Sequence, residues 1–145
     1  MTFRSKQNSQ PGKPAPYVWL LAMLAWAGIM LWLSLTPSPP QIPGALGWDK
    51  LQHAGAYGLL SLLIAGFLLS LRRLDPTRAW WFAGVTAICY GGLVEVLQLL
   101  ARTGRTAEWW DLVADAIGVV IACVLFRQVG IARSHRNKDT GKKHG

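Results

Sequence analysis

Apolar residues along the chain gather into four segments, each close to the length that crosses a membrane. The segments are residues 17–36, 51–71, 79–100 and 112–126, separated by short stretches with Pro, Gly or charged residues. A helix needs about 20 apolar residues to span a hydrocarbon core, and the fourth segment reaches that length if Trp109 and Trp110 lie in the headgroup layer. We therefore predict an all-α fold, a bundle of four transmembrane helices.

The two ends of the chain are polar and basic, unlike its apolar middle. Residues 1–16 and 129–145 have the low hydrophobicity and the excess of Lys and Arg that are typical of disordered tails. Residues 17–128 are therefore expected to form one four-helix membrane domain between two basic tails.

Composition and charge agree with a membrane protein. Hydrophobic residues make up 52% of the chain and charged residues only 15%, against about 25% in soluble domains. We predict that both termini are cytoplasmic, because this leaves only Lys50, Arg102 and Arg105 of the 15 Lys and Arg residues outside, as the positive-inside rule favours. The net charge of +8 then faces anionic membrane lipids, so we expect no nucleic-acid partner.

Polar residues recur every fourth position at the start of the second segment. Asp49, His53, Tyr57 and Ser61 share one helix face, running inward from the membrane surface. Asp49 is expected to cap this helix.

The third and fourth segments bring further polar groups to the same side of the membrane. Glu95, Gln98 and Arg102 are spaced three and four apart, while Asp111 is expected to cap the fourth helix with Asp115 one turn deeper. At a rise of 1.5 Å per residue, Glu95 lies about 7 to 8 Å and Asp115 about 6 Å inside their helix ends.

Ionisable side chains at such depth face the bundle interior and find partners there. The candidate partners of Glu95 and Asp115 are His53 and the three cations Lys50, Arg102 and Arg105. We therefore predict that three helices converge on one polar pocket open to the exterior.

Small residues on the last two segments predict close helix packing. The fourth segment has one at every fourth position and the third segment has three glycines: Ala114, Gly118, Ala122, Gly84, Gly91 and Gly92. Small residues let membrane helices approach each other. The small face of the fourth helix is expected to pack against the third helix or a second copy of the chain, so the oligomeric state stays open.

Three motifs stand in order at the segment ends: "DKLQHAGAY" from Asp49, "EVLQ" from Glu95, and "DLVADAIG" from Asp111, preceded by an Arg. With "SLTP" at residues 34–37, they resemble the VanZ-like membrane proteins over about residues 31–125. The founding member of that family is associated with reduced susceptibility to the glycopeptide antibiotic teicoplanin. The resemblance implies a multi-pass protein of the bacterial cytoplasmic (inner) membrane that acts in the cell envelope, with lipid-linked cell-wall intermediates as candidate ligands.

The family's polar positions fall on residues already singled out: Asp49, Lys50, His53, Tyr57, Glu95, Gln98, Arg105, Asp111 and Asp115. The chain departs from the family at Asp115, where Asn is frequent.

Binding without catalysis is the favoured interpretation of the predicted pocket. A lipid head, a lipid-linked glycan or a small envelope ligand would be held by the ligand-binding set of Asp49, Lys50, Tyr57, Gln98, Arg102, Arg105 and Asp111. In this interpretation, cations contact anionic groups, and Asp111 contacts hydroxyls.

Two other interpretations stay open, so enzyme activity is undecided from sequence. In an enzyme that hydrolyses or transfers a lipid phosphate, the catalytic set would be His53, Glu95 and Asp115. A variant is a divalent metal held by His53 and the three carboxylates Glu95, Asp111 and Asp115, with Glu95 and Asp115 as direct ligands. No tight motif such as H-E-x-x-H is present, so we expect neither metal nor cofactor. Alternatively, the polar residues form a buried lock that fixes helix packing without a ligand.

Overall fold

The computed structural model describes residues 14–37, 49–101 and 109–142, with the backbone alone from residue 127 onward. This part of the chain is entirely helical: α1 Pro16–Leu35, α2 Asp49–Ser70, α3 Pro76–Ala101 and α4 Trp109–Lys142. Each helix contains a stretch long and apolar enough to cross a membrane. The prediction of an all-α bundle of four transmembrane helices is confirmed, and the chain is a multi-pass membrane protein.

The helix bounds follow the apolar segments closely at most ends. The exception is α4, which continues past the predicted span to Lys142, so most of the C-terminal tail is helical where we expected disorder. No proline follows Pro76, and the Arg, Gln, Ala and Lys residues of this tail are good helix formers. The N-terminal residues 1–13 lie outside the described part of the chain.

The two predicted helix caps lie inside their helices. Asp49 is the first residue of α2. Asp111 lies in the first turn of α4, because that helix begins two residues earlier at Trp109. A carboxylate in the first turn still interacts favourably with the positive end of the helix dipole.

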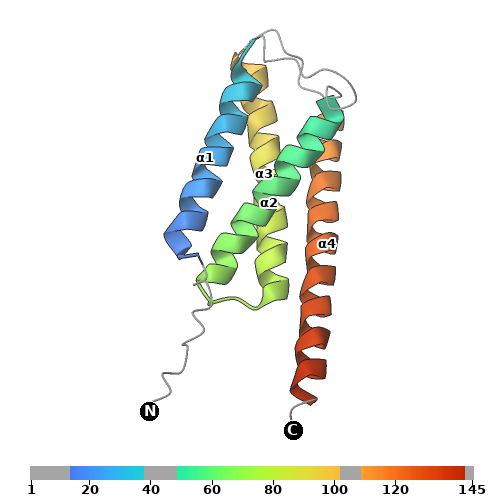
Figure 1. Cartoon of the computed structure of the whole chain (residues 1–145). Helices are drawn as coiled ribbons and strands as arrows, with labels where there is room; N and C mark the ends of the chain where they lie inside the picture. Colours follow the sequence, from blue (N-terminus) through green and yellow to red (C-terminus); the bar gives the residue numbers. More distant parts are fainter. Residues whose placement is uncertain (1–13, 38–48, 102–108, 143–145) are drawn as a thin grey trace, which may run out of the picture.

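Successive helices run in opposite directions, so the start of α1 and the end of α4 lie at the same end of the bundle (Figure 1). The opposite end carries the start of α2, the end of α3 and the start of α4, and we call it the polar end. Helix α2 contacts all three other helices and packs most extensively against α4.

The small face of α4 packs against α2, whereas we expected α3 or a second copy of the chain as its partner. A Cβ added to Gly118 would overlap the backbone of Ala54, and one added to Gly58 would lie 3.0 Å from the Gly118 carbonyl oxygen and 3.8 Å from Ala122 Cβ. On α3, Gly84 faces Val119. Helices α2 and α4 therefore approach each other backbone to backbone at the α2–α4 seam, which we define by Ala54, Gly58 and Gly118.

Helix α1 is held to the bundle by hydrogen bonds more than by burial, because Met30 is its one buried residue. Three side chains bond to backbone carbonyls between helices. Trp26 Nε1 donates to Ala56 O at 3.0 Å, Tyr90 Oη to Ala27 O at 2.7 Å, and Gln98 Nε2 to Ser34 O at 3.0 Å.

Replacing Tyr90 with Phe is expected to lower the free energy of unfolding by about 0.6 to 1.5 kcal/mol, because polar contacts between membrane helices have that strength. The change removes only the hydroxyl that holds Ala27. Unfolding in mixed detergent micelles measures the loss. Tyr17→Phe is the matched control, since Tyr17 is exposed on α1, and equal stability of the two variants would contradict the tether.

Candidate functional site

Six of the polar residues predicted from sequence meet where α2 and α4 pack together at the polar end. We define the polar cluster as Asp49, Lys50, His53 and Tyr57 of α2 with Asp111 and Asp115 of α4. All six lie within the first three turns of their helices. They come together because α2 and α4 both start at the polar end and pack side by side.

The pair His53 and Asp115 joins the two helices. His53 Nδ1 lies 3.0 Å from Asp115 Oδ1. An ionised carboxylate only accepts, so Nδ1 donates and the ring is fixed in orientation. The other ring nitrogen, Nε2, faces Asp111, whose Oδ2 lies 3.9 Å away. The imidazole is thus held by a buried carboxylate with its second nitrogen turned toward another.

Lys50 is engaged by carboxylates on both helices. Its Nζ donates to Asp111 Oδ1 across the seam and lies 3.9 Å from Asp49 Oδ2 on its own helix. Asp111 therefore uses one oxygen for Lys50 and presents the other to His53. Asp49 is the most exposed member of the three, with 48% of its side chain accessible.

Asp115 is the deepest charged residue of the cluster and is fully buried. Its Oδ2 has no hydrogen-bond partner among the residues that the structure describes. A Cβ added to Gly91 of α3 would lie 2.6 Å from this oxygen and 3.2 Å from the Tyr57 ring. A side chain at position 91 would therefore force the Asp115 carboxylate to shift at the point where three helices meet.

The inner residues of the polar face of α2 differ in what they do. The Tyr57 ring is buried and stacks on His53, with centroids 6.1 Å apart and planes at 15°. Ser61 donates to Gly58 O at 2.7 Å within its own helix and is fully buried. Tyr57 thus forms a wall of the cluster, while Ser61 satisfies the backbone.

The remaining predicted residues lie on or beyond α3. Glu95, one turn after Gly91, is half-buried and within electrostatic range of Tyr57. Gln98 is buried but turned toward α1, where it bonds Ser34, so the structure does not bring it to the cluster. Arg102 and Arg105 lie outside the described residues.

Sequence reasoning did not identify the role of Gly91, which it treated only as a packing residue. A signal was present, because Gly91 lies one turn before Glu95 and so shares its face of α3. His53 was among the candidate partners of Asp115, and the structure pairs the two. The pairing of Asp111 with Lys50 was not predicted.

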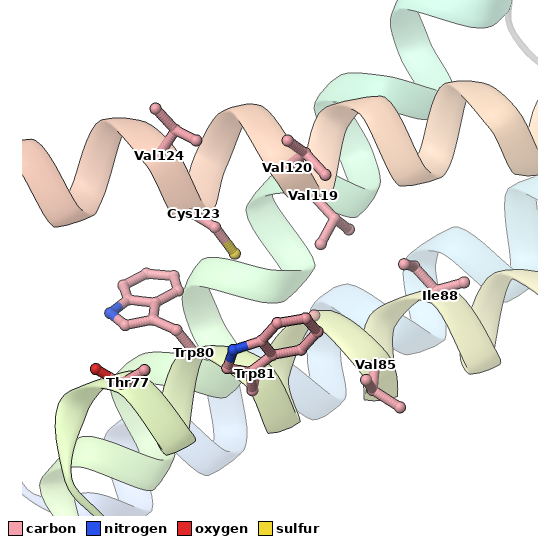
Figure 2. A pocket seen from close by; sticks show the side chains of 10 residues that line it. Thr77, Trp80, Trp81, Val85, Ile88, Val119, Val120, Cys123 and Val124 are labelled. Carbon is pink, nitrogen blue, oxygen red and sulfur yellow. The ribbon is translucent and has the colours of Figure 1, made fainter.

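An apolar groove of about 260 Å³ lies between α3 and α4, farther from the polar end. Figure 2 shows the indoles of Trp80 and Trp81 on one side and Val119, Val120 and Cys123 on the other. Val119 is four residues after Asp115, so the groove begins one helical turn from the polar cluster. Its lining suits a hydrocarbon chain.

Comparison of the chain with protein-family models, with curated proteins and with solved structures finds no match. The resemblance to VanZ-like proteins therefore stays a prediction from the three motifs.

Proposed function

We propose that the chain is a bacterial inner-membrane protein whose polar cluster faces outward and binds the head of an envelope lipid or lipid-linked glycan. The observation that carries this proposal is the His53 ring, fixed by buried Asp115 with Nε2 turned toward Asp111. Ionisable groups inside a membrane are costly and mark functional sites by default. The VanZ-like motifs support a role in the cell envelope.

The charges of the cluster favour a head group that donates hydrogen bonds. Within the described part of the cluster, the Lys50 ammonium is paired with the carboxylates of Asp111 and Asp49. With Asp115, three carboxylates therefore face one lysine. Carboxylates accept hydrogen bonds and repel anions. Binding of a phosphate by Lys50, as the sequence suggested, is therefore less favourable than contact of Asp111 and His53 with sugar hydroxyls or an amine.

The exposure of the cluster falls with depth, from 48% for the side chain of Asp49 to 1% for that of Asp115. Inward from Asp115, the buried core of the described helices is apolar except for Ser61, whose hydroxyl is bonded to its own helix. A continuous polar path through this part of the bundle is lacking, so the arrangement suits a binding pocket more than a channel.

The groove between α3 and α4 supports an amphiphilic ligand over a soluble one. It lies one turn from Asp115 along α4 and is lined by apolar side chains. A ligand whose head reaches the polar cluster can place its hydrocarbon chain in this groove. Ligand sites commonly combine apolar walls with a few polar groups in this way.

The experiment measures binding of a lipid-linked saccharide, phosphatidylethanolamine, phosphatidylglycerol and the free saccharide to the protein in nanodiscs. We expect the hydroxyl- or amine-bearing lipids to bind most tightly. Asp111→Asn and His53→Ala should each weaken that binding about 10-fold or more, as loss of a hydrogen bond to a charged group predicts.

The matched controls are Asp75→Asn and Gln52→Ala. Asp75 is exposed and pairs with Arg78 at the other end of the bundle, and Gln52 is exposed beside His53 on α2. Both should bind as the unchanged protein does. Equal binding by all variants, or preference for the free saccharide, would remove the proposal.

One observation favours an enzyme as the second candidate. Buried Asp115 orients the His53 imidazole through Nδ1, and a carboxylate that orients an imidazole in this way is the arrangement of general bases in hydrolases. The same nanodisc experiment decides between the two by product analysis. Product formed by the unchanged protein and lost in His53→Ala supports catalysis, while tight binding without product supports recognition alone.

A further inference from the structure

We propose that Asp49, His53 and Asp111 form a binding site for a divalent cation such as Zn²⁺ or Mn²⁺. One ligand atom from each residue lies within 4.8 Å of the other two. Imidazole suits zinc and carboxylates suit manganese, so this mixed set favours ions of intermediate hardness over Mg²⁺. The inference goes beyond the proposed function, because the site needs no lipid to form.

The orientation of His53 is the feature that points to a metal. Metal-bound histidines almost always donate their other ring N–H to a carboxylate or carbonyl, which fixes the ring. Here buried Asp115 accepts from Nδ1 at 3.0 Å, leaving Nε2 toward Asp111. Asp115 is therefore a positioning residue, and not the direct ligand that the sequence-based metal variant made of it.

The spacing fits a shared ion better than a direct bond. His53 Nε2 and Asp111 Oδ2 are 3.9 Å apart, beyond hydrogen-bond range. Two ligands at about 2.1 Å on a tetrahedral ion lie roughly 3.4 Å apart. A shift of about 0.5 Å brings His53 and Asp111 to that separation. A shift of at most about 1.4 Å does so for half-exposed Asp49, because the three ligand atoms lie within 4.8 Å of one another. Three protein ligands leave the fourth position open to water or a ligand oxygen.

Lys50 leaves room for the ion, but its positive charge weakens binding of a cation. It bonds Asp111 Oδ1, while the metal would use Oδ2, so both contacts can exist together. Its ammonium nevertheless places a positive charge beside a second cation. Removal of that charge should raise cation affinity, which is a signature that a structural ion pair does not produce.

The test titrates Zn²⁺ and Mn²⁺ separately into the purified full-length chain in detergent, after chelation and without added lipid. His135→Ala/His144→Ala serves as the background, because imidazoles of the tail also bind metals. We expect one ion per chain. His53→Ala should weaken binding at least 100-fold, Asp115→Ala about 10- to 100-fold, and Lys50→Met should tighten it several-fold. Gln52→Ala is the unchanged control.

Co²⁺ in place of Zn²⁺ should give visible absorption that disappears in His53→Ala. Absence of saturable binding up to millimolar ion, or binding unaffected by His53→Ala, would overturn the site. Because Lys50→Met is expected to gain affinity, loss of folding cannot imitate that result. Metal binding without lipid binding would remove the proposed function alone, and lipid binding without metal binding would remove this inference alone.

Discussion

Replacing Gly118 with Val is expected to cost more than about 3 kcal/mol of unfolding free energy or to prevent folding. A side chain at this position would overlap the Ala54 carbonyl and Cα of α2. Overpacking a core costs about 1 to 3 kcal/mol when neighbours can rotate away. Here the obstacle is helix backbone, so the α2–α4 seam has to separate. Denaturant titration in mixed micelles, with the yield of folded protein, measures the effect.

Two glycines give the graded controls for this change. A Cβ on Gly92 of α3 meets no heavy atom within 4 Å, so Gly92→Ala should stabilise by up to about 1 kcal/mol through helix propensity. A Cβ on Gly58 lies 3.0 Å from the Gly118 carbonyl oxygen, so Gly58→Ala should fall between the two. Equal stability of Gly118→Val and Gly92→Ala would mean that α2 and α4 do not meet here.

The same seam explains what the sequence could and could not predict. The four spans were predictable because apolar length is a local property, and each helix requires about 20 such residues. The shared face of Asp49, His53 and Tyr57 followed from helical periodicity alone. The partner of the small residues of α4 did not follow, since Ala114, Gly118 and Ala122 fit any close neighbour. Only the three-dimensional crossing selects α2.

Gln98 shows the limit of reasoning from spacing within one helix. Three residues advance about 300° at 3.6 residues per turn, so Gln98 lies roughly 60° around α3 from Glu95. That rotation is enough to turn its amide from the cluster toward Ser34 of α1. The assignment of Asp115 to His53 and of Asp111 to Lys50 likewise depends on the offset between α2 and α4, which no local pattern encodes. The roles predicted for Arg102 and Arg105 stay predictions.

Replacing Asp115 with Ala is expected to lower ligand affinity about 10- to 100-fold while changing the free energy of unfolding by less than about 1 kcal/mol. Loss of a hydrogen bond to a charged group costs about 1.5 to 3 kcal/mol, and releasing the His53 ring removes the orientation on which binding depends. The net change in the free energy of unfolding is smaller than this loss of binding free energy. Asp115 Oδ2 is buried without a hydrogen-bond partner in the described structure, so its removal recovers about 1 to 3 kcal/mol of desolvation.

If the polar residues only fix helix packing without a ligand, the opposite result is expected, so the measurement distinguishes the two interpretations. Breaking a buried pair that only fixes packing costs about 3 to 5 kcal/mol of stability and leaves ligand binding untouched. Asp115→Asn separates the two cases further, because its amide oxygen still accepts from His53 Nδ1 and should retain affinity within a few-fold. We would measure ligand binding in nanodiscs and the free energy of unfolding in micelles for both variants, with Asp75→Ala as control. The two measurements decide whether Asp115 orients a binding site or stabilises the packing of two helices.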